Sequence, residues 1–204
     1  MSAPVTPQSS RPAKCDACSR PLENPIFCAG CHTLHPAENA DYFELLGVAR
    51  GYDIDVEVLR RRYLAVAREV HPDRAIAHGG SAATLSLQLS ARLNRAYAVL
   101  GDPLLRSEYL LESAGGRSAA EDRTVPAEVL AQALLLREAL EEAQAAGDAA
   151  AIQHVRATAR EQLAVLQEAI AELARRLPAD EAARATLRAR LNAAKYYQKM
   201  LEAC

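Results

Sequence analysis

Apolar residues near the end of the chain recur at alternating steps of three and four residues, a spacing that is typical of packed helices. The longest such run consists of Ile152, Val155, Ala159, Leu163, Leu166, Ile170, Leu173 and Leu177. Pro126 marks one helix start, and Gly147 and Pro178 mark the turns between helices. Because short turns join helices that each have one apolar face, residues 125–204 are predicted to form a three-helix antiparallel bundle.

The composition favours an all-α chain. Of the 204 residues, 50% are hydrophobic but only 4% are aromatic, so we expect cores of aliphatic side chains between helices. The net charge of −2 gives no overall attraction to nucleic acid or to an anionic membrane. No signal-like apolar region and no run of ~18 apolar residues occurs, so we expect a cytoplasmic protein without a membrane partner. Residues 1–14, rich in Pro and Ser, are predicted to be a disordered leader.

Two Cys-x-x-Cys pairs lie close together, Cys15 with Cys18 and Cys28 with Cys31. Each pair can present two thiolates from one tight turn, and the nine-residue spacer lets the turns meet around an ion with Zn–S distances of ~2.3 Å. We therefore predict that residues 15–36 form a pair of knuckles that binds structural zinc. The spacer is shorter than in the commonest pattern, and no glycine follows either pair. A redox dithiol and an iron–sulfur cluster are the alternatives, so the metal identity stays open.

Two histidines, His32 and His35, follow the last cysteine. Either could replace Cys31 as a ligand, and otherwise both would be solvent-facing linker residues. A closed four-thiolate site has no open position at which to activate water, so the predicted role of the metal is structural. The segment has too few apolar residues for a core, and metal binding would supply its folding free energy. The role of the fifth cysteine, Cys204, stays open.

A basic helix is predicted over Asp55–Val70, with one apolar stripe at 3.6-residue spacing. The stripe consists of Leu59, Tyr63, Val66, Ala67 and Val70, and four arginines lie mainly off it, namely Arg60, Arg61, Arg62 and Arg68. Proline disfavours the α conformation in the residue before it, so the helix should stop near His71. A loop would then present His71, Pro72 and Asp73 together. The plain interpretation is a helix-ending turn beside a solvated charged face, and the alternative is a docking surface.

Two further helices are predicted after this loop. The first, from about residue 84 to residue 100, faces the apolar stripe with Leu89, Leu93, Ala96, Tyr97 and Leu100. The basic helix and this helix would lie antiparallel and form a hairpin that holds the loop between them. A short helix over Leu104–Ala114 ends at Gly115 and Gly116. We therefore predict a domain over residues 40–116 and a linker over residues 117–124.

The motifs on both sides of the tripeptide resemble those of a J-domain, in the same order. Residues 41–48 read Asp-Tyr-Phe-Glu-Leu-Leu-Gly-Val, and residues 94–100 read Asn-Arg-Ala-Tyr-Ala-Val-Leu. This resemblance implies that the domain activates the ATPase of a heat-shock chaperone. It assigns chaperone binding to His71, Pro72 and Asp73 together with Arg60, Arg61, Arg62 and Arg68.

Residues 102–111 and 129–142 resemble the HscB family, J-type co-chaperones of iron–sulfur cluster assembly, and the likeness covers residues 41–204. Some members of the family also have an N-terminal four-cysteine segment, so the resemblance extends to residues 15–31. The resemblance implies that the bundle binds an IscU-like scaffold and that the J-domain stimulates an HscA/DnaK-type chaperone. By position, the scaffold-binding residues are Leu130, Ala131, Leu134, Arg137, Glu138, Glu142 and Tyr196. Two positions depart from the family's pattern, since Ala131 replaces a bulkier apolar residue and Leu135 replaces an acidic one.

An enzyme is not expected, because no nucleophile–base pair, glycine-rich phosphate loop or open metal site is found in the sequence. The expected function is co-chaperone activity on an iron–sulfur scaffold. A J-protein that delivers a different client is one alternative, and a zinc-ribbon nucleic-acid adaptor is another. The adaptor would need a basic surface, yet residues 1–36 contain only three basic side chains against two acidic ones.

Overall fold

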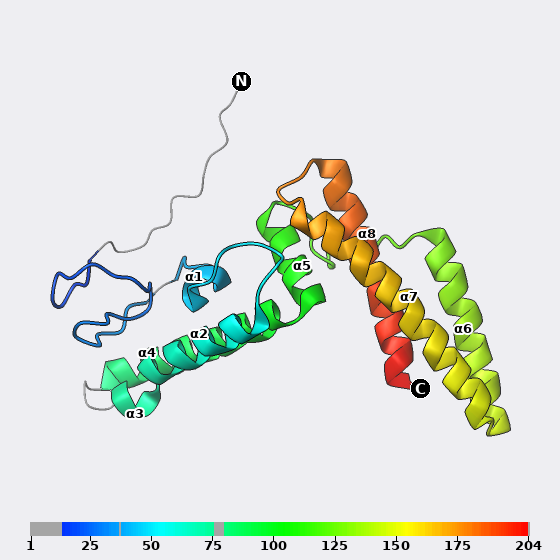
Figure 1. Cartoon of the computed structure of the whole chain (residues 1–204), viewed down its shortest axis with the longest axis horizontal. Coiled ribbons are helices and arrows are strands. Elements are labelled where there is room, and N and C mark those ends of the chain that lie inside the picture. The colour runs from blue at the N-terminus through cyan, green and yellow to red at the C-terminus, as the bar shows by residue number, and fades with distance from the viewer. Residues whose placement is uncertain (1–13, 37, 76–79, 204) are drawn as a thin grey trace. The chain divides into compact units, whose positions relative to one another are not determined.

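The computed structural model describes residues 14–36, 38–75 and 80–203 (Figure 1). The predicted leader therefore lies outside the described residues except for Lys14, and so does Cys204. The described helices are α1 (Tyr42–Leu46), α2 (Val56–Glu69), α3 (Pro72–Ala75), α4 (Gly80–Gly101), α5 (Pro103–Ser113), α6 (Ala127–Ala146), α7 (Ala149–Arg175) and α8 (Glu181–Ala203). None of the helices in this part of the chain is long and apolar enough to cross a bilayer. The chain divides into two compact units, one ending at Gly101 and the other beginning at Asp102.

Helix α1 is short, and side-chain and backbone caps define both of its ends. The carboxylate of Asp41 accepts a hydrogen bond from the Glu44 N–H at 2.8 Å, and the Glu44 carboxylate accepts one from the Asp41 N–H at 2.9 Å. Gly47 ends the helix with φ of 63°, a left-handed conformation that favours glycine. The helix buries Phe43, Leu45 and Leu46.

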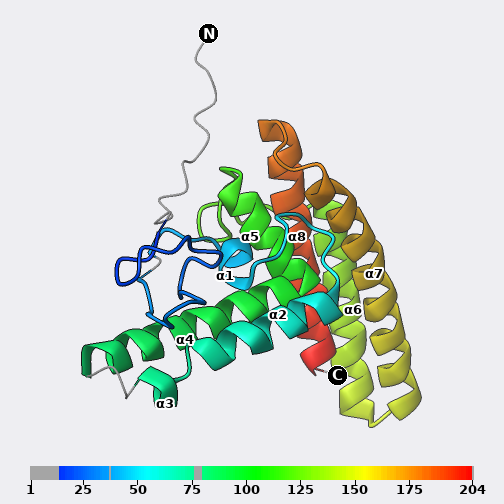
Figure 2. The same cartoon turned by 60° about the vertical axis from the view of Figure 1, so that its left-hand side comes forward.

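The predicted hairpin of the first unit is formed by α2 and α4, which lie side by side in both views (Figure 2). Leu59 and Val66 are the buried residues of α2. The Tyr63 ring stacks on Tyr97 of α4 with centroids 4.3 Å apart, and its hydroxyl donates a 2.8 Å hydrogen bond to Asn94. Aliphatic packing and one stacked aromatic pair therefore join the two helices.

The second unit packs α6, α7 and α8 along apolar seams, as predicted. Of the eight seam positions predicted for the longest run, four are buried in α7, namely Val155, Ala159, Leu166 and Ile170, and the others are partly buried. Helix α8 buries Leu187, Leu191, Ala194 and Tyr197. Gly147 ends α6 with φ of 65°, and the Asp148 carboxylate caps α7. Helix α5 also packs on α7 and α8 and so belongs to this unit, whereas the sequence places a boundary near residue 116. The domain ranges 40–116, 117–124 and 125–204 stay predictions.

A buried cation joins α5 to α8. The Arg188 side chain is 1% exposed, and its Nη1 atom lies 3.0 Å from Glu108 Oε1. Its guanidinium nitrogens make no well-aligned hydrogen bond within the described part of the chain, so charge attraction holds the pair. The same carboxylate oxygen lies 3.1 Å from Lys195 Nζ. A buried cation without a partner is costly, so this contact constrains where α5 can lie on α8.

We expect Glu108→Gln to lower the free energy of unfolding by about 3 kcal/mol, because it leaves Arg188 buried without a counter-charge. Glu112→Gln, at an exposed position on the same helix, should change it by less than about 0.5 kcal/mol. Urea denaturation followed by circular dichroism measures both. Equal losses in the two variants would show that the ion pair has no special role.

Candidate functional site

The four cysteine sulfurs gather in one cluster, in which all lie within 4.8 Å of one another. Cys15 Sγ is 3.5 Å from Cys31 Sγ, and Cys18 Sγ is 3.6 Å from Cys28 Sγ. These distances are far longer than a disulfide bond of about 2.05 Å. They approach the edge of roughly 3.8 Å expected for a tetrahedron with Zn–S distances of ~2.3 Å. The donor set and its spacing therefore fit a metal ion held by four thiolates.

Both cysteine turns have the same backbone geometry. Ser19 N donates to Cys15 O at 2.8 Å, and His32 N donates to Cys28 O at 2.8 Å. Ser19 and His32 have φ values of 57° and 60°, in the left-handed region. These residues occupy the position after each pair, where a glycine is absent from the sequence. Each knuckle closes without glycine because Ser19 and His32 adopt that conformation themselves.

The cysteines differ in acidity because their local donors differ. Hydrogen bonds from the Thr33 hydroxyl and N–H lower the pKa of Cys31 to about 6. The Arg20 N–H lowers the pKa of Cys18, but the Cys31 sulfur, burial and the other two thiols together raise it to about 12. Four thiolates so close together therefore need a cation, and metal binding would release protons.

Neither nearby histidine belongs to this cluster. The four cysteines form it alone among the residues that the structure describes, so no histidine replaces Cys31. His32 is half-exposed, and its Nδ1 lies 2.9 Å from Glu69 Oε2 at the end of α2. His35 is 3% exposed with Nδ1 3.7 Å from Asp16 Oδ2, so it is buried and not a solvent-facing linker residue.

The knuckles also contact the helices that follow them. The Asn24 side-chain amide donates a 3.2 Å hydrogen bond to the carbonyl of Leu45, near the end of α1. Together with the contact between His32 and Glu69, it joins the cysteine segment to α1 and α2. The cysteine segment is therefore part of the first compact unit and not a separate appendage.

The His-Pro-Asp tripeptide follows an anchored helix end. The Val70 carbonyl accepts hydrogen bonds from Ser86 Oγ at 2.6 Å and Ser90 Oγ at 3.3 Å, both on α4. The next side chain, His71, is 59% exposed, and that of Asp73 is 83% exposed. Two polar groups therefore face solvent directly after a carbonyl that two serines hold.

The sequence predicts a loop at the tripeptide, but the structure has a short helix there. Helix α2 ends at Glu69, and Pro72 is the first residue of the short helix α3. Proline suits this position because the N–H of the first helical residue has no acceptor within the helix, so proline removes no helical hydrogen bond. The predicted arginines of α2, Arg60, Arg61, Arg62 and Arg68, are all exposed.

An open groove of about 460 Å³ lies between α6 and α8. Leu130, Leu134 and Arg137 line it from α6, and Tyr196 and Met200 line it from α8. The exposed fractions of Leu130, Leu134 and Tyr196 are 39%, 53% and 43%. Three large apolar side chains therefore remain accessible in one concave surface, which is typical of a binding site.

The groove contains four of the seven predicted scaffold-binding residues. The other three, Ala131, Glu138 and Glu142, do not line the groove. Each follows a groove residue by one position and is exposed on the neighbouring stripe of α6. Sequence reasoning missed other lining residues, among them Glu141, Gln144 and Lys199. Helical spacing from Leu130 could have indicated Glu141 and Gln144, which continue its stripe. Nothing in the sequence alone shows which residues of α8 face α6.

Two family models match the chain. Residues 41–109 match the DnaJ domain, and residues 125–204 match the HSCB C-terminal oligomerisation domain. The HscB co-chaperone homolog of Bordetella petrii is 39% identical over 135 residues, which cover 65% of this chain and 78% of that protein. The homolog of Azoarcus is 39% identical over 109 residues, 53% of this chain and 62% of that protein.

Two solved structures have the same fold. Human HscB has a TM-score of 0.78 at 24% identity, covering 93% of this chain and 95% of the human one. HscB from Vibrio cholerae has a TM-score of 0.68 at 23% identity, and the match covers 80% of this chain and 94% of the Vibrio cholerae chain. They confirm the all-α architecture. With both domain models matched and the Bordetella petrii relative largely covered, this chain belongs to the HscB family of J-domain co-chaperones of iron–sulfur cluster assembly.

Proposed function

We propose that this chain presents an IscU-like scaffold protein to an HscA/DnaK-type chaperone. The scaffold would bind in the groove between α6 and α8, and the J-domain would stimulate ATP hydrolysis by the chaperone. The observation that carries the proposal is the exposed apolar groove. Its open side chains, Leu130, Leu134 and Tyr196, would be costly to leave in water without a partner to cover them.

The chemistry of the groove suits a protein partner. Apolar anchors at the centre would supply most of the affinity, and charged residues at the edge would set orientation. Arg137 and Glu141 provide such an edge on α6, where their side chains form a 2.9 Å ion pair. An exposed ion pair of this kind contributes little to stability, so it can be exchanged for contacts to a partner.

The J-domain would act through His71, Pro72 and Asp73. The exposed Asp73 carboxylate suits a basic residue of the chaperone, the imidazole of His71 adds a hydrogen-bonding group, and Pro72 restricts the backbone between them. The exposed arginines of α2 would steer the approach by long-range attraction. ATP hydrolysis itself would take place in the chaperone.

The four-cysteine cluster would hold zinc with a structural role. Cys15 and Cys28 are buried, and no fifth ligand or open coordination position is implied by four thiolates. Zinc would then contribute folding free energy to the segment and perform no reaction.

For the metal, we expect about one zinc per chain by elemental analysis, and we expect Cys18→Ser to release it because three thiolates remain. Cys204→Ser should retain zinc, since that residue lies far from the other cysteines in sequence. Circular dichroism should show that the helices persist in both variants. Iron with visible absorbance in the purified protein would contradict the assignment to zinc.

For the groove, Leu134→Ala and Tyr196→Ala should each weaken scaffold binding about 30-fold, the effect of removing a central anchor worth roughly 2 kcal/mol. Val165→Ala, which truncates a 59% exposed side chain on α7, is the control and should bind normally. Calorimetric titration with a purified IscU-like scaffold gives the affinities. Unchanged binding by both groove variants would rule out this surface as the scaffold site.

For the J-domain, His71→Gln and Asp73→Asn should abolish stimulation of chaperone ATP turnover, since loss of one partner of a desolvated contact costs about 2–5 kcal/mol. Scaffold affinity should not change. The exposed histidine of α7 supplies a matched control, His154→Gln, which should stimulate turnover normally. Normal stimulation by both tripeptide variants would contradict the proposed chaperone contact.

A further inference from the structure

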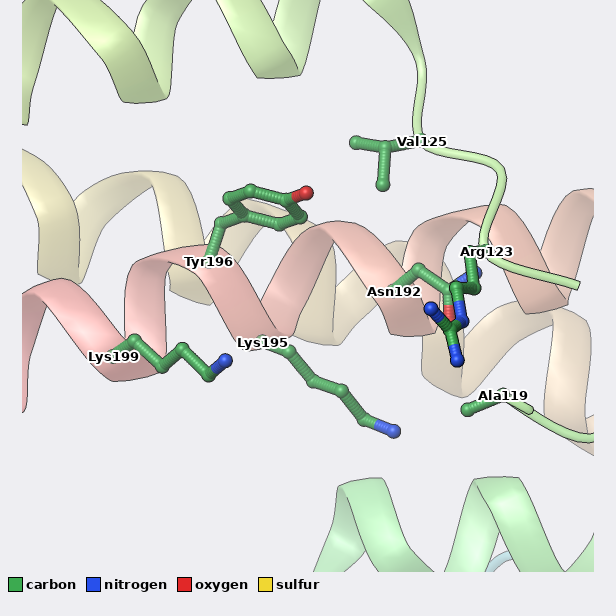
Figure 3. Close-up of a pocket in the computed structure, with 7 residues that line it drawn as sticks. All are labelled: Ala119, Arg123, Val125, Asn192, Lys195, Tyr196 and Lys199. Carbon is green, nitrogen blue, oxygen red and sulfur yellow. The ribbon is translucent and has the colours of Figure 1, made fainter.

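A second pocket of about 300 Å³ lies between α8 and the segment that precedes α6 (Figure 3). Three of its lining residues are cationic, Arg123, Lys195 and Lys199, and none is acidic. Figure 3 shows the charged ends of Lys195 and Arg123 extending to the same side of α8, beside Ala119. Tyr196 and Lys199 also line the groove, so the two pockets are continuous along α8.

The backbone around Arg123 is held in place. The side-chain amide of Asn192, which is 7% exposed, donates to the carbonyls of Asp122 at 2.9 Å and Thr124 at 3.0 Å. Hydrogen bonds from the Thr124 hydroxyl and from the Thr124 N–H, the latter 2.9 Å from Asp122 Oδ1, lower the pKa of the Asp122 carboxyl group. Arg123 therefore lies in a segment whose backbone is held on both sides.

The pocket has positive charge that the protein does not neutralise. Lys195 is paired with Glu108, but that carboxylate also serves the buried Arg188, so one negative charge is shared by two cations. Neither Arg123 nor Lys199 is paired with a carboxylate in the part of the chain that the structure describes, and both are exposed. Such a concentration of one sign of charge attracts an anionic group.

The opposite edge of the groove has the opposite charge. On α6, Glu138, Glu141 and Glu142 are exposed, and Arg137 pairs with Glu141. The combined surface is therefore net acidic along α6, apolar in the middle and basic at Arg123 and Lys199. A partner that covers it must have the reverse order of charge to avoid unpaired groups. Guanidinium and ammonium groups pair most strongly with carboxylates through charge-assisted hydrogen bonds.

We infer that the pocket lined by Arg123, Lys195 and Lys199 binds acidic side chains of the protein that occupies the neighbouring groove. This inference rests on the proposed function, in which that protein is the iron–sulfur scaffold. The scaffold would place apolar anchors between α6 and α8 and carboxylates against Arg123 and Lys199. The charge order along the surface would then admit the scaffold in one direction only.

The test is the salt dependence of scaffold binding by the full chain with Arg123→Gln and Lys199→Gln combined. Lys195 is left unchanged because of its contact with Glu108. At low salt the double variant should bind about tenfold more weakly, mainly through slower association, and the difference should shrink as salt rises. The control, Arg160→Gln with Arg175→Gln on α7, removes the same total charge and should bind like the unaltered chain.

Three results separate the possibilities. Normal affinity and normal salt dependence in the double variant, with weak binding by Leu134→Ala, would overturn this inference and leave the proposed function standing. If Leu134→Ala and Tyr196→Ala also bind the scaffold normally, both this inference and the proposed function are overturned. A third result is that inorganic phosphate binds the unaltered chain but not the double variant, while the two proteins bind the scaffold equally well. The pocket would then be a small-anion site, and the inference would fail.

Discussion

The second unit depends on one carboxylate, that of Glu108, which two cations of α8 share. Arg188 is buried, so α5 has to lie where its carboxylate can reach the guanidinium. Lys195, two turns further along α8, extends the same contact to the surface, and the adjacent residue Tyr196 opens into the groove. A single helix thus has core residues, an ion pair and exposed groove residues on successive faces, and the packing of α5 constrains the position of α8.

The first unit is organised around the end of α2. Two serines of α4 hold the Val70 carbonyl, and His32 of the second knuckle contacts Glu69 one residue earlier. The rigid helix end therefore has support from both α4 and the cysteine segment, while the following His71 and Asp73 stay exposed. This division would suit the proposed docking role, because side chains that met a partner would not also have to maintain the fold.

Features that depend on neighbouring residues could be predicted from the sequence, and features that depend on distant ones could not. Asp41, Gly47, Gly147 and Asp148 cap helices through contacts within a few residues, and the spacing of the cysteines limits how their turns can close. The burial of His35, the contact between His32 and Glu69 and the burial of Arg188 arise from packing between segments far apart in sequence. Arginine and histidine are usually surface residues, so composition alone predicts the opposite.

The net charge of −2 conceals how charge is distributed within the second unit. Glutamates of α6 and cations of α8 nearly cancel in the sum while lying on opposite edges of one apolar groove. Apolar contacts alone would allow a partner to bind in several orientations, because the hydrophobic effect has no direction. Separated charges would remove that freedom from the proposed scaffold, since a reversed partner would bring like charges together. If the chain presents a scaffold to a chaperone, as we propose, a defined orientation is the property that this surface would have to supply.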